Sequence, residues 1–174
     1  MRVTTALFSS ALSLLVCAAL GCDRPNSYRL VSERYGFSVE FPEKPVEQTS
    51  TNDEGLPNSS WKVEHEKVVA KDYYTARATS YKEILDPDNE LVSNEALLAL
   101  NGVKMIEHRR FKMRAPATGR EVDAMATTSK ELSTGATISS IYVVDGHNMI
   151  SVSVRTNDDP GKAALYLGSF TLLR

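Results

Sequence analysis

The chain is poor in cysteine, in histidine and in net basic charge. Its 174 residues include two Cys and three His, with 20 Lys+Arg against 22 Asp+Glu and a formal net charge of −2. A nucleic-acid-binding domain usually carries a basic excess, so we expect no nucleic-acid partner. Two cysteines cannot supply the disulfide framework of a small secreted fold, and a domain of about 150 residues does not need one. The composition favours one ordinary globular domain.

The common signatures of catalysis and of cofactor binding are also missing. His65, His108 and His147 have no second ligand at the close spacing of a zinc site, and no His-Glu-x-x-His motif occurs. There is no Gly-x-Ser-x-Gly nucleophile elbow, and Gly161-Lys162 lacks the other residues of a P-loop. We therefore predict a protein that is not an enzyme and has no metal or cofactor, and we interpret His65 as a half-buried structural residue.

One acidic segment resembles a cation site only superficially. The run from Asp86 to Glu90, Asp-Pro-Asp-Asn-Glu, offers the hard oxygen ligands that calcium prefers. It lacks the central glycine and the distal glutamate of an EF-hand loop. We interpret it as a solvated turn.

A long hydrophobic run is present only near the N-terminus. Residues 6–20 are nearly all apolar or small and follow Arg2. These roughly 15 residues are too few to cross about 30 Å of hydrocarbon comfortably as a helix. A positive start, a short apolar run and small residues at its end predict a signal peptide over residues 1–21 that is cleaved off.

The end of this run predicts a lipid anchor. Ala19-Leu20-Gly21-Cys22 resembles the bacterial lipobox, in which the cysteine directly after the cut receives a diacylglycerol thioether and then an amide-linked acyl chain such as palmitate. Several long chains anchor a protein firmly, because each buried methylene contributes about 0.8 kcal/mol. Cys17 lies inside the leader, so lipidation of Cys22 also removes an otherwise unpaired exported thiol.

One departure from the lipobox leaves an alternative open. Leucine is the usual residue three positions before the cysteine, and here Ala19 takes its place. Ala19-Leu20-Gly21 also satisfies the small-x-small rule of an ordinary signal peptide, which would release a soluble exported protein. We prefer the lipoprotein and expect it at the cell membrane, facing the periplasm or the exterior. Residues 22–27 are then the lipidated cysteine and a tether of about 20 Å, and residues 28–174 are one domain.

Alternation of apolar and polar residues predicts mostly β structure in that domain. Asp145-Gly146 is a strong hairpin turn, and Asp159, Pro160 and Gly168 are typical of the cap, first position and end of a helix. We expect hairpins across Tyr35-Gly36 and across a turn at 70–72, and a loop over residues 49–60. We also expect a second helix capped by Ser93, with Ala96, Leu100, Val103 and Ile106 on one face. The strands expected are 30–31, 37–41, 61–69, 73–84, 109–114, 120–128, 138–144, 149–155 and 170–173.

This pattern predicts the class α+β, a curved antiparallel β-sheet flanked by about two helices. Its turns and core strands resemble those of small bacterial envelope lipoproteins of unassigned function that have a PsbP-like domain. The resemblance implies that fold and a non-enzymatic binding or assembly-support role, but it supplies no catalytic motif to transfer. The residues that carry it are 35–45, 119–121, 141–144, 150–154, Ala163 and 169–170.

The densest basic run is the candidate contact surface. In a strand, Arg110, Lys112 and Arg114 would share one face, and Arg109, Phe111 and Met113 the other. One interpretation is a solvated outer face. The other is contact with anionic lipid headgroups or with a partner, which contributes about 1 kcal/mol per basic residue near an anionic membrane.

The sequence thus favours a membrane-anchored envelope lipoprotein that acts as a non-catalytic binding or assembly-support module. Its expected partners are the membrane, through the lipid, and an envelope protein. Two alternatives stay open. A small-ligand carrier would have an apolar pocket between sheet and helix, and an envelope hydrolase would have carboxylates converging near His65.

Overall fold

The computed structural model describes residues 27–66, 71–100, 102–157 and 159–174. The predicted signal peptide, Cys22 and all but the last residue of the predicted tether lie outside the described residues.

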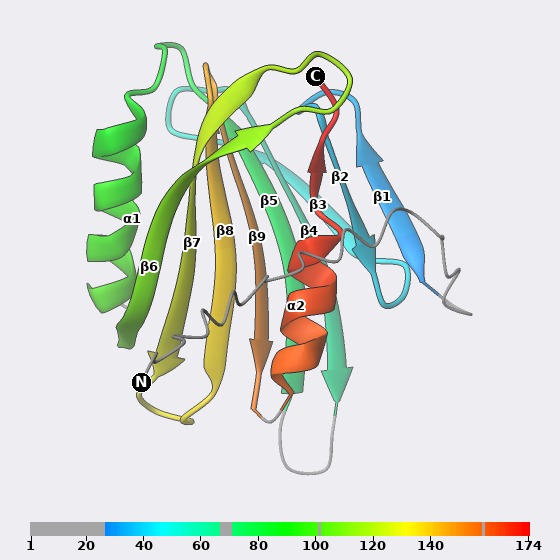
Figure 1. The fold of residues 1–174 in the computed structure, drawn as a ribbon, viewed down its shortest axis with the longest axis vertical. Helices are drawn as coiled ribbons and strands as arrows, with labels where there is room; N and C mark the ends of the chain where they lie inside the picture. The colour runs from blue at the N-terminus through cyan, green and yellow to red at the C-terminus, as the bar shows by residue number, and fades with distance from the viewer. Residues whose placement is uncertain (1–26, 67–70, 101, 158) are drawn as a thin grey trace, which may run out of the picture.

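Two antiparallel sheets and two helices make up the described part of the chain (Figure 1). The larger sheet has the strand order β3-β4-β5-β9-β8-β7-β6, and the smaller has the order β1-β2-β10. The strands are β1 (Tyr28–Ser32), β2 (Phe37–Phe41), β3 (Val46–Thr51), β4 (Pro57–Glu66), β5 (Lys71–Ser80), β6 (Val103–Arg114), β7 (Glu121–Glu131), β8 (Thr137–Asp145), β9 (Asn148–Thr156) and β10 (Thr171–Leu172). The helices are α1 (Pro87–Leu100) and α2 (Pro160–Gly168).

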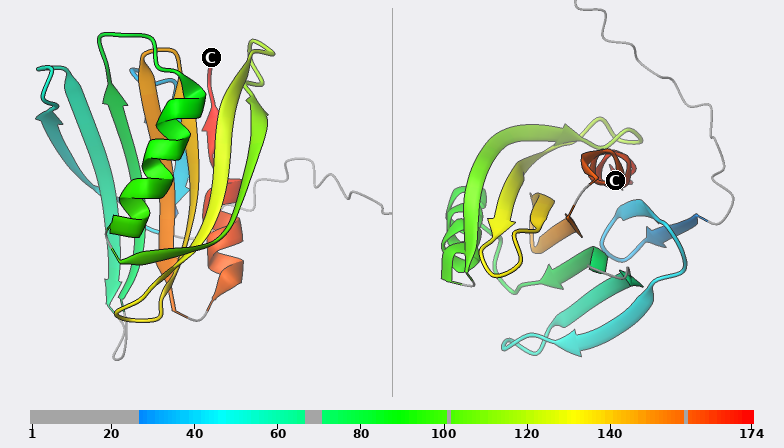
Figure 2. Two further views of the ribbon diagram at one scale, coloured as in Figure 1. Left: turned by 90° about the vertical axis from the view of Figure 1, so that its left-hand side faces the viewer. Right: turned by 90° about the horizontal axis from the view of Figure 1, so that it is seen from below.

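The two faces of the seven-stranded sheet have different neighbours. Figure 2 shows α2 and the small sheet on one side of it, which we call the inner face, and α1 on the other side, the outer face. Because side chains alternate along a strand, Tyr74 and Val152 belong to the inner face, and Tyr73 and Ser153 belong to the outer face.

The inner face holds the main core, which is dense in aromatic rings. Phe37 lies 5.7 Å from Trp61 and 5.8 Å from Phe170, measured between ring centroids. Tyr166 of α2 lies 5.3 Å from Tyr74 and donates a hydrogen bond to the carbonyl of Thr75 at 2.8 Å. Burial raises the pKa of Tyr166 well above its usual value, and the neighbouring Tyr74 adds to this. These contacts fix α2 and the small sheet against the large one.

The predicted hairpins are confirmed. β1 and β2 pair across Gly36, and β8 and β9 pair across Gly146. Both glycines have positive φ, 72° and 60°, a conformation that other residues rarely adopt. The strands predicted before and after the turn at residues 115–119 are β6 and β7, and both are longer than expected.

The loop predicted over residues 49–60 is confirmed only for residues 52–56 and is too long at both ends. Residues 46–51 form β3, and β4 already begins at Pro57, so the turn between them is short. Polar, exposed side chains suggested a loop, but they belong to an edge strand whose backbone is held by pairing with β4. Part of the turn predicted at 70–72 lies outside the described residues, and β5 begins at Lys71.

The predicted first helix is also misplaced. α1 begins at Pro87 rather than after Ser93, and Val103 and Ile106, expected on its face, lie in β6. The run predicted as a solvated turn is therefore a helix start. The Asp86 carboxylate accepts hydrogen bonds from the Asp88 main-chain N–H at 2.9 Å and from Asn89 Nδ2 at 3.1 Å.

The second helix is close to the prediction. Asp159 caps α2 by accepting a hydrogen bond from the Lys162 N–H at 3.2 Å, and Pro160 is at its start. Gly168 is the last helical residue rather than the first one beyond the helix. The fold is thus mostly β with two helices, but it has two sheets where the sequence indicated one.

Candidate binding surface on the outer face

Helix α1 covers part of the outer face. It contacts β6, β7 and β8, and beside it a small second core forms around Met125, Tyr142 and Val144. Burial raises the pKa of Tyr142, which favours its neutral form. The rest of the outer face, over β4, β5 and β9, is open.

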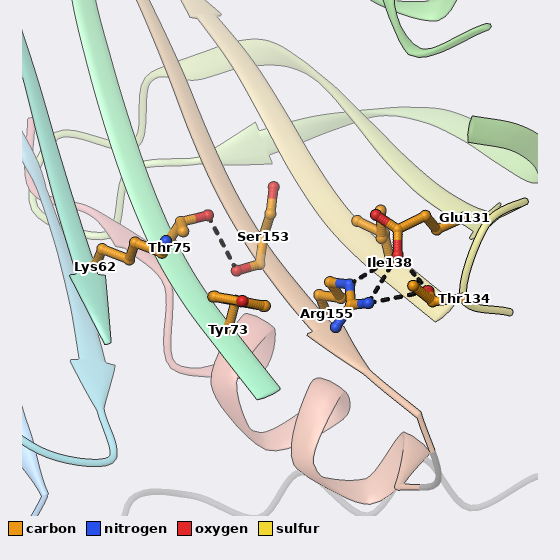
Figure 3. Close-up of a pocket in the computed structure, with 8 residues that line it drawn as sticks. All are labelled: Lys62, Tyr73, Thr75, Glu131, Thr134, Ile138, Ser153 and Arg155. Carbon is orange, nitrogen blue, oxygen red and sulfur yellow. Dashed lines mark hydrogen bonds and ion pairs between the residues drawn. The ribbon is translucent and has the colours of Figure 1, made fainter. Parts of the chain in front are cut away.

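A groove of about 420 Å³ lies on this open part. Its lining comes from β4, β5, β9, β8, β7 and the turn after β7, so distant parts of the sequence meet there (Figure 3). We call it the outer groove, and its residues are Lys62, Tyr73, Thr75, Glu131, Thr134, Ile138, Ser153 and Arg155.

Tyr73 is the aromatic centre of the outer groove. Lys62 Nζ lies 4.6 Å from the centroid of its ring, and the Arg155 guanidinium carbon lies 5.4 Å from it. Cations close to an aromatic ring are attracted by its negative face. The ring is half-buried between the two charges, and it presents an apolar surface beside them.

Arg155 is held in place by the far side of the outer groove. Its guanidinium donates to Glu131 Oε2 at 2.7 and 3.2 Å and to Thr134 Oγ1 at 2.9 Å. Hydrogen bonds from Thr134 and then from Arg155 lower the pKa of Glu131. This network fixes one wall of the groove.

The open part of the outer face carries more positive than negative charge among its described side chains. Lys62 is paired with Glu64, and Arg155 with Glu131. Two further exposed cations lie on the same face of β5: Arg77, and Lys71, whose Nζ lies 4.0 Å from the same Glu64. This local excess contrasts with the net charge of −2 for the whole chain.

The predicted basic run lies elsewhere on the outer face, on β6. Arg110, Lys112 and Arg114 share one side of the strand, as expected from alternation. Arg110 is paired with Asp88 at the start of α1, and Lys112 Nζ lies 2.6 Å from Asp123 Oδ1. Arg114 is exposed, and its guanidinium packs beside Gly119. The run is solvent-exposed and is not part of the outer groove.

The histidines do not converge. His65 Nε2 lies 3.6 Å from Glu43 Oε1, and its ring packs against Tyr74 at 5.8 Å. His147 lines a separate hollow in which Arg120 is paired with Asp145, and this pairing raises the pKa of Arg120. Among the described residues no three His, Cys, Asp or Glu side chains are grouped so that they could hold a metal ion.

The outer groove was not foreseen from the sequence, although part of its signal was visible. Alternation along residues 150–155 already placed Ser153 and Arg155 on one face. Nothing local indicated that Glu131 and Lys62 lie beside them, because this depends on the order of strands in the sheet.

Comparison with known proteins identifies the fold and nothing finer. No family model matches the chain, and no curated protein matches it. Comparison with solved structures shows that the chain has a PsbP-like fold. It is similar to the solution structure of cyanobacterial PsbP (CyanoP) from Synechocystis sp. PCC 6803, with a TM-score of 0.54 and 8% identity over 90% of this chain and 98% of that one. At this identity the likeness shows the fold alone.

In the part of the chain that the structure describes, neither helix is both long and apolar enough to cross a bilayer.

Proposed function

We propose that this chain is an envelope lipoprotein that acts as a non-catalytic binding module for a protein partner at the membrane surface. The outer groove is the observation that carries the binding role. Anchoring through Cys22 is supported by the lipobox-like sequence and places the domain close to the bilayer.

The shape and chemistry of the outer groove favour a protein segment over an enclosed small molecule. The Lys62 side chain at its rim is 46% exposed, whereas small-ligand sites bury most of their ligand. Aromatic residues and Arg, such as Tyr73 and Arg155 here, are enriched in protein contact surfaces. The positive excess around it favours an acidic partner segment.

Photo-crosslinking in cells tests this role. A benzoylphenylalanine at Thr75 should form one defined adduct with an envelope protein, and the same group at exposed Leu165 of α2 should not. Ser153→Trp fills the outer groove and should reduce the Thr75 adduct at least fivefold, whereas Ala117→Trp on the exposed turn between β6 and β7 is the matched control. An adduct that survives Ser153→Trp, or no adduct at all, would contradict the proposal.

Anchoring is tested separately by mass and by fractionation. Protein extracted from membranes should carry the mass of a diacylglycerol and an acyl chain on Cys22, and Cys22→Ala should lose both. A bare sulfur on protein recovered from the soluble envelope fraction would leave the groove intact but contradict the anchor.

A further inference from the structure

The two edges of the seven-stranded sheet are built differently. β6 carries several charged side chains and a register shift between Met105 and Glu107, where its pairing with β7 is irregular. β3, at the other edge, pairs with β4 in an unbroken register over all six residues. All six are exposed, and Glu47 is the only charged residue among them.

This difference matters because an open strand edge presents unpaired N–H and C=O groups. Charges and bulges are the usual devices that keep such an edge from adding another strand. β6 has both, and β3 has neither a register shift nor more than one charge. In the right-hand view of Figure 2, β3 (cyan) lies at the bottom, away from both helices.

We propose that β3 is the site at which a second copy of this chain binds, by antiparallel pairing of β3 with β3 around a two-fold axis. The two large sheets then continue into one another across the pair of molecules. This proposal is independent of the outer groove.

Symmetry restricts the possible registers. An antiparallel pair related by a two-fold axis keeps both outer faces on the same side, so one residue must stand opposite its own copy. If the axis passed beside Glu47, the two Glu47 carboxylates would lie opposite each other. If it passed beside Ser50, Glu47 of one copy would lie opposite Asp53 of the other. A centre at Gln48 would oppose Glu43 and Asp53. Like charges directly opposite destabilise a sheet.

A centre at Thr49 avoids each of these clashes. The strand pairs are then Thr49–Thr49, Gln48–Ser50 and Glu47–Thr51. A Thr–Thr pair stabilises neighbouring strands, and the other two pairs bring no like charges together. The same register brings Lys44, just before the strand, toward Glu54 in the partner's turn. The second copy is therefore a partner that β3 fits in charge and in hydrogen bonding.

The interface is small and should be weak in dilute solution, because stable interfaces bury at least about 1,200 Å². Molecules confined to one membrane surface have a high effective concentration, which favours such an interface. Tests should therefore use the full chain in membranes.

A cysteine scan along β3 tests the register. In the Thr49-centred pair, two Thr49 Cα atoms lie about 5 Å apart, within disulfide range, whereas two Val46 Cα atoms lie about 20 Å apart. After mild oxidation, Thr49→Cys should give at least five times the disulfide-linked dimer of Val46→Cys, above the background of the wild-type chain. A flat profile, or a maximum at another position, overturns the proposal.

A charge substitution gives a second measurement. Thr49→Lys places two lysines opposite each other, and co-purification of two differently tagged copies should fall at least fivefold. Ser133→Lys adds the same charge to an exposed turn and should change nothing. Equal recovery with both variants, or a Thr49→Cys adduct with a different protein and no dimer, rules out the second copy.

Discussion

The inner and outer faces of the seven-stranded sheet are built from the same strands but differ in how deeply their side chains are buried. On the inner face, side chains such as Ala76, Val152 and Val154 have 0% exposure and are covered by α2 and the small sheet. On the outer face, the same strands present Tyr73, Ser153 and Arg155, which are half-buried at most. The comparison teaches that the main core lies on the inner side of the sheet, and that the part of the outer face not covered by α1 is left open.

The largest difference should appear when one large side chain is removed from the main core under the inner face and one from the outer face. Phe37→Ala should lower the free energy of unfolding by about 3–5 kcal/mol, because it leaves a cavity beside Trp61 and Phe170. Ile138→Ala in the outer groove should cost about 1 kcal/mol, since that side chain is half-buried. Urea unfolding of the two variants measures both values, and similar losses would contradict the comparison.

An ion pair on the inner face should also contribute more to the free energy of unfolding than one on the outer face. Asp72 on the inner face has 0% exposure, and Lys162 Nζ of α2 lies 3.4 Å from its Oδ2. Lys162→Met removes one partner of a buried carboxylate and should cost about 2 kcal/mol, since the lysine itself is 40% exposed. Lys112→Met on the outer face breaks an exposed pair with Asp123 and should cost less than about 1 kcal/mol. Denaturation at neutral pH compares the two variants. A smaller loss of unfolding free energy for Lys162→Met than for Lys112→Met would refute the expectation.

A smaller effect on stability, which should depend on pH, is expected for Glu131 in the wall of the outer groove. The pKa of Glu131 is lowered in the folded state, so its contribution to stability is present above the unfolded value, close to 4.5, and is lost as pH falls through the folded value. Glu131→Gln should therefore be less stable than wild type by about 1 kcal/mol at pH 7, and the gap should shrink in acid. Unfolding of both proteins at a series of pH values measures this gap. A gap that grows in acid would have the wrong sign.

The smallest effect on stability is expected at the centre of the outer groove. Tyr73→Ala removes a ring beside two cations at a half-buried site and should cost about 1 kcal/mol or less. The same variant should sharply reduce the adduct formed from Thr75, because the ring is the apolar part of the proposed contact. Unchanged crosslinking with Tyr73→Ala would place the contact elsewhere.

Local patterns predicted the parts of the fold whose geometry depends on neighbours in sequence. Asp145-Gly146 and the cap at Asp159 were identified because each satisfies a requirement of a few consecutive residues. β3 was missed because its residues are polar on both sides, as expected of an edge strand but equally typical of a loop. α1 was misplaced because Asp86, rather than Ser93, caps it.

The candidate site was predicted only in part. Alternation correctly placed Arg110, Lys112 and Arg114 on one side of β6, but it gave no sign that Asp88 and Asp123 pair with two of them. The role of these three residues in contact with a membrane or partner stays a prediction. The outer groove draws on strands that are up to 93 residues apart, from Lys62 to Arg155, and no local rule brings those together.

What the sequence determined by itself is the set of strands with one apolar face and most of their turns, since each depends on adjacent residues. Only the tertiary structure decided which strand lies beside which. That order separates β3 and β6 as edges, sends α1 and α2 to opposite faces, and brings Lys62, Tyr73 and Arg155 together. The physical reason is that strand order is selected by burial of the whole apolar face, a sum over distant contacts that no short segment contains.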